Sequence, residues 1–126
     1  MTSTMTKNSQ HLRASISTYC GVEFFPLAPR FEDIWIEDLA HHLANVNRYN
    51  GACVKPYSVA QHSVYVAEWL AEHVGLAPLR VAELGMEERT VAENNIVKWG
   101  LLHDASEAYV SDICGPIKPF IVGYKG

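Results

Sequence analysis

A run of ionisable side chains between residues 101 and 112 carries the clearest chemical signal in this 126-residue chain. The run reads LLHDASEAYVSD and places His103 beside Asp104, with Glu107 three positions later. On a helix, neighbouring side chains point about 100° apart, and residues three or four apart share one side. These three side chains can therefore face one cation. An imidazole together with a carboxylate suits divalent metals such as Mn, Fe, Co, Ni or Zn.

A second histidine, His62, is the natural third ligand for such a cation. It lies between Val59 and Val66 on the apolar side of a predicted helix, so its imidazole is expected to point inward. Burying an unbonded polar group costs roughly 1–3 kcal/mol, and a shared metal would satisfy it. A hydrogen-bonded core histidine is the simpler alternative, and spacing alone does not decide between the two.

Three predicted helices must position these side chains. The first is expected to begin with Asp33 as its cap and to end near Arg48, with an apolar stripe at helical spacing made of Ile36, Leu39, Ala40, Leu43 and Val46. Trp35, Trp69 and Trp99 are expected in the core, whereas His41, His42 and His73 are expected near helix surfaces in contact with water.

The second helix is predicted to open at Ser58, with Gln61 completing a capping box. Its predicted core face consists of Val59, His62, Val66, Trp69 and Leu70. The third is predicted to run unbroken from about Val91 to about Val110, which would place His103, Asp104 and Glu107 on one helix. Residues 76–90, between the two, are expected to hold a short helix and a charged turn.

The remaining segments are read from turn residues and composition. Residues 1–15 are polar and rich in Ser and Thr, which predicts a disordered leader, and residues 16–126 are expected to form a single domain. Aromatic and β-branched residues on both sides of Gly21 predict a short extended hairpin. Gly51 and Pro56 predict a loop between the first two helices.

Composition limits the classes of partner. A net charge of −4 and a hydrophobic content of 48% favour a globular domain and argue against a nucleic-acid groove or a basic membrane face. An anionic substrate would then need a local cation or a well-placed arginine. Cys20, Cys53 and Cys114 show no C-x-x-C spacing, and no apolar run approaches the ~20 residues of a membrane span. We therefore expect a cytoplasmic protein with reduced thiols.

Three blocks of this sequence resemble the HD-domain phosphohydrolases. They are IEDLAHHLANVNRYNG (36–51), YSVAQHSVYVAEWL (57–70) and GLLHDASEAYVSDICGPIKPF (100–120), and the match covers about residues 19–120. The resemblance is to the bacterial branch that includes 5′-deoxynucleotidases and related phage nucleotide hydrolases. It implies an all-α helical bundle with a short extended N-terminal segment, and hydrolysis of a nucleotide or a similar small phosphate ester.

The same resemblance implies roles for individual residues. His62, His103 and Asp104 match three ligands of one divalent metal ion, whose identity among Mn, Co, Fe, Ni, Zn and Mg stays open. Glu107 matches the acid that orients or activates the attacking water, and Asp112 a second acid that lines the substrate site. Arg48, 14 residues before His62, matches an arginine offered to the substrate phosphate, a role that suits a planar guanidinium.

This sequence departs from the family at the fourth metal ligand, an Asp expected on a later helix. No Asp follows Asp112, so we expect a shortened member of the family or a ligand supplied from elsewhere. An alternative is a non-catalytic remnant that binds a nucleotide or a protein partner, and an exposed packing surface would favour a homodimer. A purely structural metal site needs four protein ligands, and the sequence offers three good candidates.

Overall fold

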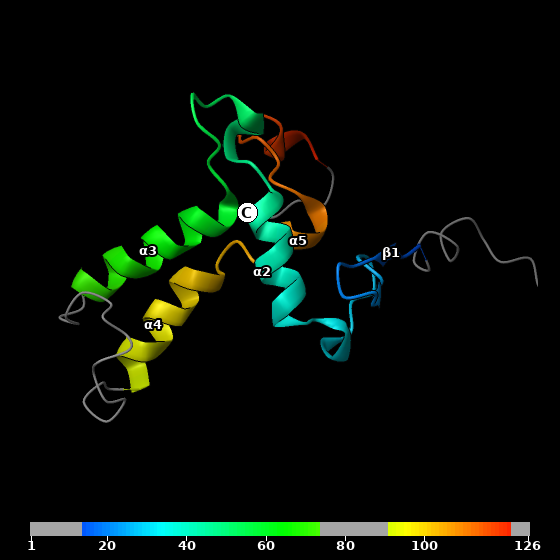
Figure 1. Cartoon of the computed structure of the whole chain (residues 1–126), viewed down its shortest axis with the longest axis horizontal. Coiled ribbons are helices and arrows are strands. Elements are labelled where there is room, and N and C mark those ends of the chain that lie inside the picture. Colours follow the sequence, from blue (N-terminus) through cyan, green and yellow to red (C-terminus); the bar gives the residue numbers. More distant parts are fainter. Residues whose placement is uncertain (1–13, 74–90, 122–126) are drawn as a thin grey trace, which may run out of the picture.

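The computed structural model describes residues 14–73 and 91–121, and this part of the chain is mostly helical (Figure 1). The principal helices are α2 (Ile36–Asn45), α3 (Val59–His73), α4 (Val91–Leu102) and the short α5 (Glu107–Val110). The strands β1 (Ile16–Ser17) and β2 (Glu23–Phe24) precede them. Short 3-10 helices lie at Phe31–Asp33, Arg48–Gly51 and Lys118–Phe120. Within the described residues, no helix is both long and apolar enough to cross a membrane.

The predicted hairpin is confirmed as a two-stranded antiparallel sheet. Ile16 pairs with Phe24 and Ser17 with Glu23. Gly21 has a φ of 81°, the left-handed conformation that its lack of a Cβ permits. The turn is fastened to α2, because the buried carboxylate of Asp38 accepts a hydrogen bond from the amide of Cys20 at 2.7 Å. Of the predicted leader, residues 1–13 lie outside the described residues.

Helix α2 begins later than the sequence suggested. Asp33 does not cap it: this residue is buried in the preceding 3-10 helix and forms an ion pair with Arg30 at 2.7 Å. Trp35 holds the N-cap position, and Val46 leaves the helix in an extended conformation. Leu39 and Leu43 of the predicted stripe are buried, and they form a core cluster with Val59 and Ala108. The hydrophobic core therefore lies where α2, α3 and α5 meet.

Helix α3 begins where Ser58 predicted, because the Ser58 hydroxyl accepts the Gln61 amide at 3.1 Å. The capping box is half formed, since the Gln61 side chain donates to the Tyr65 hydroxyl instead. The buried side of α3 consists of small residues as well as valine: Val59, Ser63, Ala67 and Ala71. The tryptophan prediction is wrong, because Trp35, Trp69 and Trp99 are 47%, 56% and 66% exposed.

Helices α3 and α4 pack closely along their length and lie side by side, as Figure 1 shows. Gly100 fits this contact without rearrangement, whereas a Cβ there would overlap Leu70 Cδ1 and lie 3.3 Å from Val66 Cγ1, so both side chains would have to shift. The two helices run in opposite directions, so the first turn of α3 and the last turn of α4 lie at the same end of the pair (Figure 1). The segment predicted at residues 76–90 lies outside the described residues.

The predicted single helix from Val91 to Val110 is wrong. Helix α4 ends at Leu102, and residues 103–106 form turns before α5 begins at Glu107. The cause lies in the hydrogen bonding: His103 Nδ1 contacts the Gly100 carbonyl oxygen at 2.7 Å. The following amides then bond three residues back, from Ala105 to Leu102 and from Glu107 to Asp104. Such i to i−3 bonds tighten the chain and end the regular helix.

His42 is also placed differently from the expectation. Its Nε2 accepts the Tyr19 amide at 3.0 Å, so its Nδ1 carries the proton that is donated to the Ala108 carbonyl at 2.9 Å. This half-buried histidine thus connects the N-terminal turn, α2 and α5.

The other two histidines of these helices stack on aromatic rings. His41 stacks on Tyr19, with ring centroids 3.7 Å apart, and His73 stacks on Trp69, with ring centroids 3.8 Å apart.

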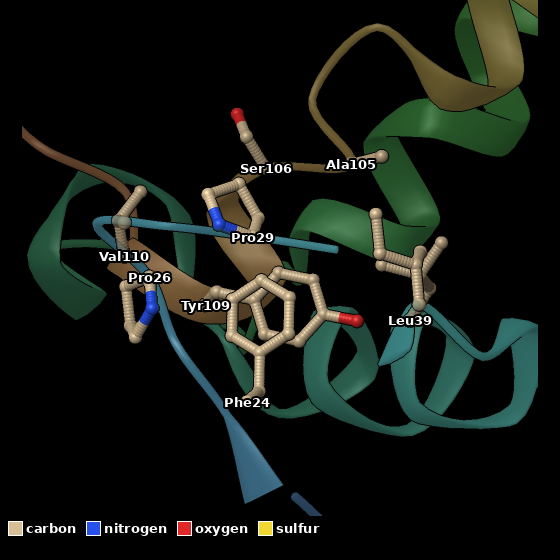
Figure 2. Close-up of a pocket in the computed structure, with 9 residues that line it drawn as sticks. Phe24, Pro26, Pro29, Leu39, Ala105, Ser106, Tyr109 and Val110 are labelled. Atoms are coloured by element: carbon tan, nitrogen blue, oxygen red, sulfur yellow. The ribbon is translucent and has the colours of Figure 1, made fainter. Parts of the chain in front are cut away.

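An apolar pocket of about 300 Å³ lies between β2, α2 and α5. Figure 2 shows Phe24 and Tyr109 stacked at its edge, with ring centroids 3.8 Å apart. Ala105 and Ser106, from the turn between α4 and α5, also line it. Its lining carries no charged side chain, so this pocket does not suit a phosphate group.

Candidate metal centre

His62, His103 and Asp104 come together at the common end of α3 and α4. One potential ligand atom from each residue lies within 4.8 Å of the other two. The Oδ2 atom of Asp104 is 3.0 Å from His103 Nε2 and 3.6 Å from His62 Nε2. All three side chains are half-buried. Two residues come from the turn after α4 and one from the first turns of α3, so the helix pair itself assembles the group.

Hydrogen bonds on the far side of each imidazole direct the Nε2 atoms inward. The contact of His103 Nδ1 with the Gly100 carbonyl requires a proton on Nδ1, which leaves a lone pair on Nε2 in the neutral ring. The Tyr57 hydroxyl lies 3.4 Å from His62 Nδ1 and can orient that ring in the same way. Metal-binding histidines characteristically carry such partners. The donor set therefore fits a divalent cation.

The electrostatic environment keeps His62 in its ligand-competent form. Burial lowers the pKa of His62 below the usual histidine value, and the nearby positive charge of Arg48 lowers this pKa further. The negative charge of Asp104 acts in the opposite direction but does not prevail. A neutral imidazole binds metals, whereas an imidazolium does not.

Arg48, which the family resemblance assigns to the substrate phosphate, lies next to this group. Its Nη1 atom is 3.9 Å from Asp104 Oδ2. The guanidinium lies over the rings of Tyr49 and Tyr57, with its central carbon 5.1 and 5.6 Å from their centroids. The backbone also positions this residue, because its amide donates to the Tyr57 carbonyl at 2.8 Å and so brings the end of α2 to the start of α3.

Glu107 is placed near the metal ligands by the turn rather than by a shared helix. With His103, Asp104 and Lys118, it lines a pocket of about 140 Å³. Its Oε2 atom is buried and has no hydrogen-bond partner among the described residues. Burial raises the pKa of Glu107 to about 7, and the negative charges of Asp104 and Asp112 contribute. A carboxyl group with this pKa can exchange a proton with water near neutral pH.

Asp112 lies outside the ligand group and beyond the end of α5. The chain turns at Ser111, which has a φ of 67°, and Asp112 then lines a second pocket of about 380 Å³. Arg48, Tyr49 and Asn50 form another part of its lining. Tyr49 and Asn50 have φ values of 54° and 52°, in the left-handed region that such residues adopt at an energetic cost. Backbone strain of this kind often occurs at binding sites.

Three contributors to this site were missed by the sequence reasoning or given another role. The Gly100 carbonyl could have been found, since it lies one helical turn before His103. Tyr57 was considered as a stacking surface, but its hydroxyl also contacts His62. Lys118 lines both pockets, but no motif or helical spacing in the sequence relates it to the ligand residues. In the larger pocket its positive charge adds to that of Arg48.

No protein-family model matches the chain. The chain is similar to the uncharacterized protein YfdR of Escherichia coli (strain K12), with 32% identity over 110 residues, which cover 87% of this chain and 49% of that protein. It is also similar to the uncharacterized protein RCAP_rcc00048 of Rhodobacter capsulatus, with 39% identity over 100 residues, which cover 75% of this chain and 42% of that protein. The chain thus spans about half the length or less of these curated relatives.

Proposed function

We propose that this protein is a metal-dependent phosphohydrolase of the HD-domain type that acts on a nucleotide or a similar small phosphate ester. The observation that carries the proposal is the convergence of His62, His103 and Asp104, whose ligand atoms lie within 4.8 Å of one another. A cationic Arg48 and a Glu107 with a pKa of about 7 next to this group support hydrolysis over a structural role for the metal.

His62, His103 and Asp104 would hold a divalent cation, whose positive charge would make a nearby water a stronger nucleophile near neutral pH and would offset the charge of a phosphate. Glu107, which lines the same pocket as His103 and Asp104, accepts a proton from the attacking water. Arg48 and Lys118 hold the non-reacting phosphate oxygens from the two pockets that they line. The phosphorus–oxygen bond is broken by water directly, without a covalent enzyme intermediate.

The larger pocket, which Arg48 and Asp112 line, can hold the part of the substrate beyond the reacting phosphate. Its volume of about 380 Å³ is within the range of small-molecule sites. Tyr49 presents an exposed ring there, and Asp112 and Asn50 present hydrogen-bonding groups. An aromatic base can stack on such a ring while a sugar or base edge bonds to the polar groups. A nucleotide therefore fits the combination of the two pockets better than a simple anion does.

The test combines metal analysis with turnover. We expect the purified protein to bind one divalent ion per chain and to release inorganic phosphate from at least one member of a panel of nucleoside mono-, di- and triphosphates. Asp104→Asn should lose both the metal and the activity. Glu68→Gln, which removes one negative charge from an exposed position on α3, should keep both.

Other outcomes lead to different conclusions. Full metal content in Asp104→Asn would exclude the proposed ligand group. Bound metal and retained nucleotide binding without phosphate release would instead favour a non-catalytic nucleotide-binding protein. In that case the metal held by the three ligands would contribute only to nucleotide binding, and Glu107 would not act as a base.

A further inference from the structure

Arg48 and a metal ion would compete for the same oxygen atom. Asp104 Oδ2 is the atom that approaches both imidazoles, at 3.0 and 3.6 Å, and Arg48 Nη1 lies 3.9 Å from it. A cation bound to this oxygen would thus lie beside a permanently charged guanidinium. Two positive charges in a half-buried site repel each other strongly. The position of Arg48 in this structure therefore favours the metal-free state.

Arg48 already faces a second carboxylate. The pocket of about 380 Å³ is lined by Arg48 on one side and by Asp112 on another, and the charge of Asp112 already acts on the guanidinium in this structure. The Nε atom of Arg48 is buried without a hydrogen-bond partner among the described residues, so its present position leaves one donor unsatisfied. The guanidinium also lies over the rings of Tyr49 and Tyr57, which contact its apolar face and leave its N–H groups directed at the carboxylates.

We propose that Arg48 switches between two carboxylates: in the metal-free protein its guanidinium, at the edge of the larger pocket, is shared by Asp104 and Asp112, and when a divalent cation binds it leaves Asp104 and pairs with Asp112 alone. This inference rests on the proposed function and adds an order of events to it. Metal binding releases the arginine, and the released arginine then binds the substrate phosphate. Because coupling between two ligands is reciprocal, a phosphate that holds Arg48 in the pocket also strengthens metal binding.

Loss of Arg48 should therefore improve the affinity of the site for a divalent cation. Calorimetric titration with Co²⁺ alone is expected to show a dissociation constant roughly 5- to 150-fold lower for Arg48→Ala than for the wild type, the usual range of coupling between sites. Lys98→Ala is the matched control, because it removes one positive charge from an exposed position on α4. Its Co²⁺ affinity should stay within about twofold of the wild type.

A second variant keeps the test informative if Arg48→Ala folds poorly. In the wild-type background, Asp112→Asn should weaken Co²⁺ binding severalfold, because the displaced arginine has lost its alternative partner. In the Arg48→Ala background, where it folds, the same substitution should have a clearly smaller effect. Such a double-mutant cycle isolates the interaction between the two residues.

The outcomes separate this inference from the proposed function. Higher Co²⁺ affinity in Arg48→Ala, with Lys98→Ala unchanged, would support the switch. Equal or lower Co²⁺ affinity in Arg48→Ala, or an equal effect of Asp112→Asn in both backgrounds, would overturn the switch while leaving the metal site in place. Absence of Co²⁺ binding in every variant, the wild type included, would overturn both the switch and the proposed function.

Discussion

The Nε2 atom of His103 lies 3.0 Å from the Oδ2 atom of Asp104, the next residue in the chain. In a neutral imidazole whose Nδ1 proton is donated to Gly100, both facing atoms are hydrogen-bond acceptors. Two acceptors at this distance repel each other unless a proton or a metal cation lies between them. His62 Nε2 lies 3.6 Å from the same oxygen, and it adds a further acceptor in the tautomer whose Nδ1 proton faces the Tyr57 hydroxyl. This arrangement of acceptors is stable when it holds positive charge, which links the stability of the site to cation binding.

The close contact between α3 and α4 is the first feature that can be tested by substitution. Gly100→Ala would place a Cβ against Leu70 and Val66, so we expect a loss of about 1–3 kcal/mol in the free energy of unfolding despite the better helix propensity of alanine. Chemical denaturation measures the change. Gly115→Ala, where a Cβ meets no atom within 4 Å, should change stability by less than about 0.5 kcal/mol. Equal stability of both variants would contradict the packing described.

The Tyr57 hydroxyl provides a test of how the His62 ring is oriented. Tyr57→Phe removes the group that lies 3.4 Å from His62 Nδ1, and we expect metal affinity to fall by up to about tenfold, since this contact is long. The melting temperature should change little. Tyr65→Phe is a suitable control, because its hydroxyl bonds to Gln61 on the exposed side of α3. If both variants bind metal equally well, Tyr57 does not orient His62.

The sequence predicted the residues of the site better than the way in which they are positioned. The approach of His62 to the His103–Asp104 pair agrees with the expectation of an inward histidine on one helix facing this pair on another, although spacing alone did not separate a metal ligand from a core histidine. The prediction that His103 and Glu107 share one helix is wrong, because α4 ends at Leu102. Apolar periodicity continues from Leu102 to Ala108 whether or not the backbone turns, so periodicity cannot reveal a turn that is fastened by a side chain.

The largest errors concern aromatic residues. Trp69 and Trp99 fit the helical stripes, yet small residues such as Ala67 and Gly100 form the contact between α3 and α4. Two helices that pack closely have small side chains at their contact. A prediction from hydrophobicity instead places large apolar side chains such as tryptophan in the core. Similarly, the role of His42 depends on a partner at Tyr19, 23 residues earlier in the chain, which local patterns do not predict.

Trp99 offers a readout of metal binding that does not depend on activity. Its ring centroid is 5.8 Å from that of His103, so a Co²⁺ ion bound to His103 should quench its fluorescence. We expect saturable quenching with one equivalent of Co²⁺ in the wild type and in Trp35→Phe. Trp99→Phe should lose most of this quenching. Quenching that persists in Trp99→Phe would place the ion elsewhere, for example at His73, which stacks on Trp69.

The half-buried carboxyl group of Glu107 gives a pH dependence whose sign is defined. Its pKa is raised from 4.5 to about 7 by burial and by the charges of Asp104 and Asp112. Between these two values the folded protein binds more protons than the unfolded chain, so this residue makes the folded state less stable as the pH rises from 4.5 to 7. Below pH 4.5 the group is protonated in both states, and above pH 7 the full penalty is present.

Glu107→Gln removes this titration and isolates its effect. In the presence of a chelator, we expect the variant to gain stability relative to the wild type as the pH rises from 4.5 to 7.5, by about 1 kcal/mol when solvent screening of a partly exposed group is taken into account. Urea denaturation at several pH values measures this difference. Glu68→Gln, on the exposed side of α3, should follow the wild type at every pH. A Glu107→Gln curve parallel to the wild type would mean that this carboxyl group ionises as it does in water, and Glu107 would lose its assignment as the base.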